Sequence, residues 1–201
     1  MAETARAKSI DRVVFSSDEL PADLDDRARY GLWHDIYTAR FGSIAFARPP
    51  DRPFLAELMF AAFGEVGLGR FEGTISRAGR SPHIVAADGS DDFCLLVNRG
   101  RAPLLVVQDG REATLAPNSA VLLSDTEPGD VRGAAENAWH ALVVPRKPLL
   151  DRVSCAEDLA ATVLDPHQPA VRHLTRYLTL LDDAGWIEDD PPLVDHIGST
   201  L

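Results

Sequence analysis

The residues of this 201-residue chain that could ligate a transition metal or act as a catalytic base are its six histidines and two cysteines. A metal-dependent enzyme built on a small β-barrel typically uses two histidines one residue apart, a nearby carboxylate and a distant third histidine. No two histidines here have that spacing. His83 and His140 are the only ones on predicted strands, where a single histidine is more often hydrogen-bonded within the fold than bound to metal. The sequence therefore predicts no metal and no cofactor.

Nucleophilic catalysis would need a serine or cysteine on a strained turn beside a histidine. Cys94 instead stands inside an apolar run, which favours its packing as a small apolar side chain. Gly64, Gly67 and Gly69 lie between strand-like runs rather than before a helix, so they indicate bends or bulges and not a phosphate-binding loop. We predict no catalytic residues and no enzymatic activity.

An acidic cluster surrounds Gly89 and consists of Asp88, Asp91 and Asp92. It lacks the longer loop and the terminal glutamate of a calcium site, and it precedes an apolar strand. We interpret it as a solvated turn.

Bulky polar or aromatic side chains on the strands of a small barrel can point into its mouth and bind a small molecule. The candidates for such contacts are Arg77, His83, Phe93, Trp139 and His140. Adjacent strand residues face opposite ways, so Trp139 and His140 cannot both point inward without a bulge. We favour Trp139 inward, because outward it would need cover from a helix. Two alternatives stay open: the candidates could lie outside the barrel, or Trp139 could fill a closed core.

Charge and composition narrow the possible partners. The chain has 20 basic and 31 acidic residues and a formal net charge of −11, which disfavours nucleic acid and anionic membranes as ligands. Its 45% of hydrophobic residues suffices for a core, yet no apolar run approaches the roughly 20 residues of a membrane span. Residues 1–11 lack the apolar core of a secretion signal, so we expect a soluble, cytoplasmic protein without a disulfide framework.

The spacing of apolar residues predicts one helix over residues 20–41, followed by about a hundred residues of short strands separated by glycine, proline, asparagine and aspartate. The predicted strands are residues 44–48, 54–63, 66–71, 74–78, 83–87, 93–98, 104–108, 112–115, 120–123 and 138–144. Asp109-Gly110 predicts a two-residue hairpin turn. Many short strands with no helix between them favour an antiparallel barrel or jelly roll over a parallel sheet.

Helical periodicity returns after Pro148, where Ser154 and Glu157 have capping-box spacing. Pro169 opens a further helix that ends near Gly185. The apolar stripe of this helix consists of Val171, Leu174, Leu178 and Leu181. We predict dimerisation through this stripe, although a one-sided stripe equally suits packing on the chain's own barrel. Asp190-Pro191 resembles another helix start, and we expect that helix to be cut short at Leu201.

The order and spacing of several segments together resemble one family. These segments are Leu32-Trp33, Pro53-Phe54, residues 104–117, residues 121–125, Pro128, residues 142–146, residues 164–166 and residues 174–181. They cover nearly the whole chain, and together they resemble the N-terminal sensor domain of AraC-type (AraC/XylS) transcriptional regulators.

The resemblance implies a cupin-like barrel that binds a small effector, helices that mediate dimerisation, and a C-terminal DNA-binding domain with two helix-turn-helix units, which this sequence lacks. We therefore expect an α+β chain with an N-terminal arm (residues 1–19), a helix plus effector-binding barrel (20–147) and a helical dimerisation region (148–201). The expected partners are an unidentified small-molecule effector and a second copy of the chain, with DNA bound only through the missing domain and no membrane. The alternatives are a cupin-fold enzyme acting on a small metabolite and a dimerisation module without a ligand.

Overall fold

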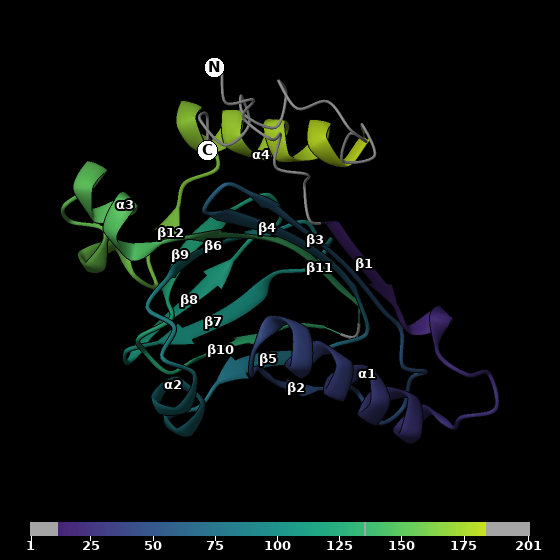
Figure 1. The fold of residues 1–201 in the computed structure, drawn as a ribbon. Helices are drawn as coiled ribbons and strands as arrows, with labels where there is room; N and C mark the ends of the chain where they lie inside the picture. The colour runs from purple at the N-terminus through teal and green to yellow at the C-terminus, as the bar shows by residue number, and fades with distance from the viewer. Residues whose placement is uncertain (1–11, 135, 184–201) are drawn as a thin grey trace, which may run out of the picture.

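The computed structural model describes residues 12–134 and 136–183, which form two facing antiparallel sheets with helices around them (Figure 1). The larger sheet contains, in order across it, β1 (Arg12–Ser16), β3 (Ala56–Phe63), β4 (Val66–Gly73), β11 (Asn137–Val144), β6 (Phe93–Asn98), β9 (Ala120–Ser124) and β12 (Val163–Leu164). The smaller sheet contains β2 (Ala45–Ala47), β5 (Arg77–Arg80), β10 (Gly129–Arg132), β7 (Leu104–Gln108) and β8 (Arg111–Leu115). The helices are α1 (Asp26–Phe41), α2 (Pro82–Asp88), α3 (Arg146–Arg152) and α4 (Pro169–Asp183), with 3-10 turns η1 (Ser17–Glu19) and η2 (Glu157–Leu159).

Four strand pairs nest inside one another. β7 pairs with β8, β6 with β9, β5 with β10 and β4 with β11, and successive pairs alternate between the two sheets. A long antiparallel hairpin folded over in this way is a jelly roll. The predicted α+β fold class, a cupin-like jelly roll with an N-terminal helix and C-terminal helices, is confirmed. Its strands form two facing sheets, however, and not the single closed barrel of the prediction.

The innermost pair closes through the turn that the sequence predicted. Asp109 and Gly110 connect β7 to β8 with φ of 51° and 69°. Both values lie in the left-handed region that a type I′ turn requires at its two central positions, and Asp and Gly tolerate that region best.

Helix α1 joins the two sheets on one side. The Asp25 carboxylate caps it by accepting a hydrogen bond from the Ala28 backbone N–H (2.8 Å). The helix therefore ends as predicted but begins at Asp26 rather than at residue 20. Trp33, which is fully buried, lies between Phe15 of β1 and Phe46 of β2, with ring centroids 5.9 and 5.4 Å away. Because β1 and β2 belong to different sheets, this aromatic contact holds the sheets together.

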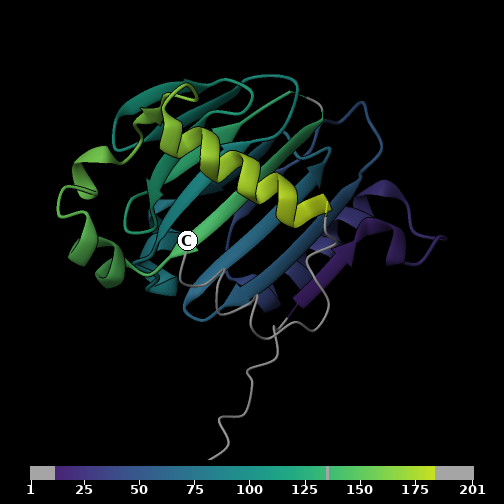
Figure 2. The ribbon, with the colours of Figure 1, turned by 90° about the horizontal axis from the view of Figure 1, so that it is seen from above.

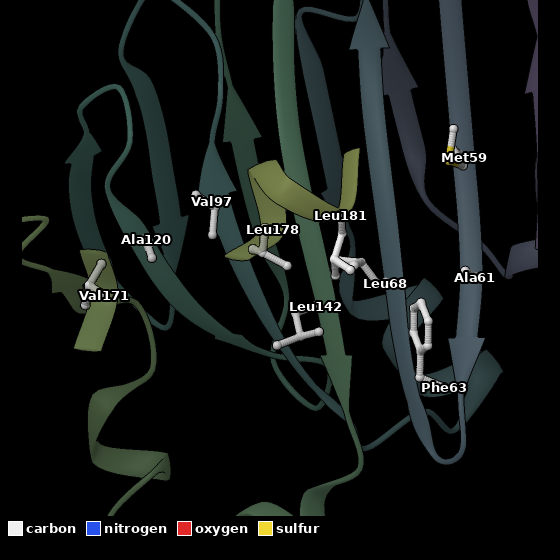
Figure 3. Close-up of a cluster of buried hydrophobic side chains, with 10 residues drawn as sticks. All are labelled: Met59, Ala61, Phe63, Leu68, Val97, Ala120, Leu142, Val171, Leu178 and Leu181. Atoms are coloured by element: carbon white, nitrogen blue, oxygen red, sulfur yellow. The ribbon is translucent and has the colours of Figure 1, made fainter. Parts of the chain in front are cut away.

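Helix α4 crosses the outer face of the larger sheet, the face turned away from the smaller one (Figure 2). Its apolar side chains Val171, Leu178 and Leu181 enter one buried cluster with residues of β3, β4, β6, β9 and β11, as Figure 3 shows. Leu174 packs against the same cluster. The stripe predicted for dimerisation thus packs on the chain's own sheet, which was the alternative reading of the pattern.

Several predicted elements need correction. Residues 83–87, predicted as a strand, lie in helix α2, which Ser81 caps, Pro82 begins and Gly89 ends in the left-handed region. The strand predicted at 74–78 begins only at Arg77, because Thr74 bonds back to Leu55. The helix expected after Ser154 is a single 3-10 turn, η2, while α3 precedes it and includes Pro148 in its first turn.

The first described residues fall within the predicted N-terminal arm (1–19) and join the larger sheet. Residues 12–16 form strand β1, which pairs antiparallel with β3 from Arg12 opposite Ala61 to Ser16 opposite Glu57. Strands β1, β10 and β12 were not predicted, because each is short or carries charged residues and so lacks an apolar period. The helix expected from Asp190 lies outside the described residues.

Candidate functional site

The two faces of the larger sheet pack against different partners, α4 on the outer side and the smaller sheet on the inner side. On the outer face, under α4, Leu68, Val97 and Leu142 are at most 4% exposed. On the inner face, which is turned towards the smaller sheet, Val143 and Cys94 keep part of their surface accessible. The space between the sheets is therefore not closed by side chains along its whole length.

The strand register divides the inner face into three rows that run across β3, β4, β11, β6 and β9. The first row is Ala62, Gly67, Val143, Cys94 and Leu123; the second is Phe60, Gly69, Ala141, Leu96 and Val121; the third is Leu58, Phe71, Trp139 and Asn98. Small residues dominate the first two rows, whereas the third row carries the bulky ones. All members of the first row except Gly67 are partly accessible, while Trp139 is the only third-row residue that is not buried.

The third row closes one end of the space. Trp139 stacks on Phe71 with ring centroids 4.3 Å apart. It also contacts the buried cluster between the sheets, to which Leu104 and Val106 of β7 belong. Asn98 is buried beside them and donates to the carbonyls of Ala102 and Leu115, both at 2.9 Å. This end is a packed core.

Gly67, in the first row, has no side chain and so leaves room for the neighbouring ring of Phe60. A Cβ on Gly67 would lie 2.8 Å from the ring of Phe60, closer than carbon atoms approach one another. The ring of Phe60 therefore lies over the backbone of β4, with Phe41 of α1 beside it at a centroid distance of 5.6 Å. The first two rows form a shallow apolar floor with an aromatic wall.

Charged side chains gather at the end of the sheets next to the first row, where two connections cross from one sheet to the other. The Arg80 guanidinium, on the last residue of β5, binds the Asp88 carboxylate at the end of α2 (Nη1–Oδ2 2.7 Å). It also donates to the Asp125 carbonyl oxygen (3.3 Å), and its Nε lies 3.9 Å from Asp125 Oδ1. The hydroxyl of Ser90 donates to Asp125 Oδ2 (2.8 Å). These contacts join the β5–β6 connection to the β9–β10 connection.

Two neutral groups, the Cys94 thiol and the Tyr37 phenol, lie close to the charges of Arg80 and Asp125. Burial, with the negative charge of Asp125 nearby, raises the pKa of the Cys94 thiol to about 12. The pKa of the Tyr37 phenol, on α1, is also raised, by burial and then by Cys94 and Asp125. Among the described residues the Tyr37 hydroxyl has no hydrogen-bond partner, and its side chain is partly accessible. Tyr37, Arg80, Cys94 and Asp125 thus bring together four elements around one space, and the thiol is protonated there rather than nucleophilic.

Arg77 and His83 lie away from this space. Ala78 packs towards the smaller sheet's inner side, opposite Val131, so Arg77 points outward by the alternation of β5. It is half exposed and donates to Asp130 Oδ1 (2.7 Å). His83 lies on the exposed side of α2.

Phe93 and His140 lie on the outer face of the larger sheet. Phe93 is buried in a cluster with Leu122 and Ala156, and the Arg146 guanidinium lies 4.8 Å above its ring. His140 is 1% exposed. Burial, and then the charges of Arg99 and Arg70, lower its pKa to about 3.

The Arg99 guanidinium lies 3.1 Å from His140 Nε2. Because a guanidinium only donates, this nitrogen is the acceptor and the ring is neutral. Of the five candidates, Trp139 alone has its side chain between the sheets, which is the orientation that the sequence analysis favoured for it.

Sequence reasoning did not find Tyr37, Arg80 or Asp125, and it interpreted Cys94 as a small apolar side chain packed within a strand. Only Cys94 carried a signal, because it alternates with Leu96 along a predicted strand. Within the described ranges, no three histidine, cysteine, aspartate or glutamate residues group as metal ligands. None of the described helices is long and apolar enough to cross a membrane.

The jelly roll of two facing antiparallel sheets defines a class of small β-domains to which the cupins belong. This chain belongs to the AraC-binding-like domain family, which its sequence matches over residues 33–196.

Among solved structures, the AraC-like transcriptional activator CuxR aligns with a TM-score of 0.72 and 18% identity, over 92% of this chain and 66% of that one. Two further structures match less of the fold. An RmlC-like cupin protein from Desulfovibrio desulfuricans aligns with a TM-score of 0.37 and 14% identity, over 50% of this chain and 90% of that one. The EutQ protein of Clostridium difficile aligns with a TM-score of 0.35 and 10% identity, over 49% of this chain and 75% of that one. No curated protein sequence matches the chain.

Proposed function

We propose that this chain is the effector-sensing and dimerisation part of an AraC-type transcriptional regulator, and that a small molecule binds between its two sheets. The observation that carries the proposal is the accessible first row of the inner face, in a domain of the AraC-binding-like family. Trp139 forms the inner wall of this site, and Tyr37 and Cys94 supply polar groups at its open end. DNA is bound by a separate domain, which fits the net charge of −11, and this function belongs in the cytoplasm.

Helix α1 is the element that transmits binding. Its Trp33 holds the two sheets together, and its Tyr37 faces the bound molecule. A molecule that fits one position of α1 better than another shifts the population towards that position, whereas equal affinity for both would change nothing.

Dimerisation uses the exposed side of α4, because its apolar stripe is occupied by the chain's own sheet. That side presents Arg172, Arg176 and the 61% exposed Leu180. Sedimentation velocity of the chain with and without a Leu180→Glu substitution tests this point: the dimer should dissociate while the fold persists.

The test of binding follows tryptophan fluorescence during titration with small molecules. Trp139 is partly accessible between the sheets, whereas Trp33 is fully buried on α1, so a ligand should change the emission of the wild-type chain. The Trp139→Phe variant should still bind, as measured by calorimetry, but without the fluorescence change. If a bound molecule left Trp139 emission unaltered, the site would lie elsewhere.

A further inference from the structure

We infer that the molecule bound between the sheets is uncharged and largely apolar, and that it carries a carbonyl oxygen which accepts a hydrogen bond from the Tyr37 hydroxyl. The inference rests on the proposed function and adds the chemical class of the effector. It makes Tyr37 the residue that selects among apolar molecules.

The ring of Tyr37 is held in place by other aromatic rings. It stacks on Trp33 of the same helix with ring centroids 5.4 Å apart, and Phe41 lies 5.3 Å away one turn further on. Phe46 of β2 meets it edge-on at 4.8 Å. Because the ring is packed by three neighbours, the hydroxyl is presented in a fixed position, which a hydrogen bond to a ligand requires.

The groups without a hydrogen-bond partner near this hydroxyl are donors. Among the described residues the Tyr37 hydroxyl makes no hydrogen bond, and burial raises its pKa, so it keeps its proton. Arg80 Nε is a buried N–H without an acceptor and lies 3.9 Å from Asp125 Oδ1. The Cys94 thiol also keeps its proton. A donor left unpaired in apolar surroundings costs free energy, so the group that fits here is an acceptor.

The charges at this end of the sheets disfavour a charged acceptor. The two connections that cross here have no lysine or arginine, and their carboxylates are Asp88, Asp91, Asp92, Asp125 and Glu127. Arg80, which offsets part of this charge, is already paired with Asp88 and Asp125. A carboxylate or phosphate would therefore be repelled. An ammonium group has donors only and would leave the Tyr37 proton unpaired. An uncharged oxygen avoids both costs.

The rest of the molecule is apolar because the accessible inner face is apolar. Phe60 of β3, Ala141 and Val143 of β11 and Leu123 of β9 all keep part of their surface accessible on this face. None of these side chains has a polar atom. An aromatic ring or a short hydrocarbon chain buries apolar surface against them without leaving a polar group of its own unpaired.

The test compares five probes that share a phenyl ring on a short chain. 4-Phenyl-2-butanone offers a carbonyl, 3-phenylpropanol a hydroxyl, and propylbenzene no acceptor; 3-phenylpropylamine and 3-phenylpropionate are cationic and anionic at pH 7. Calorimetric titration should give the ketone and the alcohol similar affinities, and both charged probes should bind about tenfold more weakly than the ketone. Trp139 fluorescence is followed with every probe.

The Tyr37→Phe variant removes the hydroxyl and keeps the ring. It should weaken binding of the ketone about fivefold, which corresponds to one neutral hydrogen bond, and leave the affinity for propylbenzene unchanged. The carbonyl stretch of the bound ketone should also move to higher frequency in this variant, because the hydrogen bond that lowers it is lost.

Tyr30→Phe is the matched control, since it makes the same substitution on the same helix. The Tyr30 hydroxyl donates to the Phe46 carbonyl oxygen (2.6 Å), so its loss should lower the urea midpoint and leave the affinity for every probe unchanged. Tyr37→Phe should not lower the midpoint, because the Tyr37 hydroxyl has no partner among the described residues.

Four results would overturn the inference: equal affinity of the wild-type chain and Tyr37→Phe for the ketone, a charged probe that binds as tightly as the ketone, a midpoint lowered as much by Tyr37→Phe as by Tyr30→Phe, or no binding of the ketone up to about 10 mM. The first two, accompanied by the Trp139 signal, would leave the proposed function standing. Binding of the ketone without that signal would count against the proposed function itself.

Discussion

The two faces of the larger sheet are built for different tasks, although they belong to the same strands. The outer face has a cluster of leucine and valine side chains under α4, in which Leu68 and Val97 are buried while Leu95 and Val144 are partly buried, so its residues serve stability. The inner face mixes glycine, alanine and cysteine with larger apolar residues in its first two rows, and its first row remains partly accessible except at Gly67. The contrast shows how one sheet can use its large side chains on one face to stabilise a space left by small ones on the other.

The largest expected effect on stability comes from a substitution under the outer face of the larger sheet. Leu178→Ala should lower the free energy of unfolding by about 3 to 4 kcal/mol, because it leaves a cavity at a fully buried position. Val143→Ala, in the first row of the inner face, should cost less than about 1 kcal/mol, because that side chain is already partly accessible. Urea denaturation measures both. Equal losses would contradict the distinction between the faces.

The next effect concerns His140, the buried histidine of the outer face. Its pKa is about 3 in the folded chain and near 6.5 when unfolded, so the unfolded chain takes up a proton first as the pH falls. Stability is therefore full above pH 6.5 and is lost below it, by about 2 kcal/mol between pH 7 and pH 5. The His140→Gln variant should lack this part of the loss when urea unfolding is compared at the two pH values. Parallel pH profiles of the two proteins would show that His140 is not buried as a neutral ring.

A smaller effect is expected from filling the inner face. Gly67→Ala places a methyl group against the ring of Phe60, which must move over the site. We expect the affinity for 3-phenylpropanol to fall roughly fivefold while the free energy of unfolding changes by less than about 1 kcal/mol. Gly64→Ala is not a suitable control, since Gly64 has φ of 64°, so the exposed Ala86→Gly substitution on α2 is used. Unchanged affinity would mean that the ligand does not lie over the first row.

The smallest effect is expected at Arg77. The side chain is half exposed and paired with Asp130 on the outside of the smaller sheet, so Arg77→Ala should change stability by no more than about 0.5 kcal/mol. Binding of 3-phenylpropanol should be unaffected in calorimetry. A loss of binding would restore the role that the sequence suggested for this residue and would break the assignment of the site to the inner face.

Local signals in the sequence were sufficient for much of the fold. The run at 93–98 and the run at 104–108 coincide with β6 and β7, and Asp109-Gly110 turns as its residue types require. Helix α2 was missed because Ile84 and Val85 favour strands, although Ser81-Pro82 is a helix start. In α2 the capping of the helix by Ser81 outweighs the strand propensity of Ile84 and Val85.

The site was harder to predict because it depends on distance in space. Trp139 was assigned inward because alternation allows only one of Trp139 and His140 to point inward and an outward indole would need cover from a helix; both arguments need only its own strand. Arg80 and Asp125 are 45 positions apart and meet only because the nested strand pairs bring the ends of β5 and β9 together. The direction of the Arg77 side chain was hard to predict for a related reason: its strand begins later than the local pattern indicated, so its orientation could not be read from the sequence.

Helix α1 is part of the wall of the site without being part of either hydrogen-bonded sheet. A change of side chain in a strand must preserve a backbone ladder and a core on the opposite face, whereas a change at Tyr37 or Phe41 leaves the ladders intact and has to be accommodated only by the aromatic cluster around Trp33. Selectivity for a new ligand can therefore arise by substitution in one helix while the jelly roll stays as it is. Helix α1 can therefore vary in sequence while the two sheets keep it in the same place.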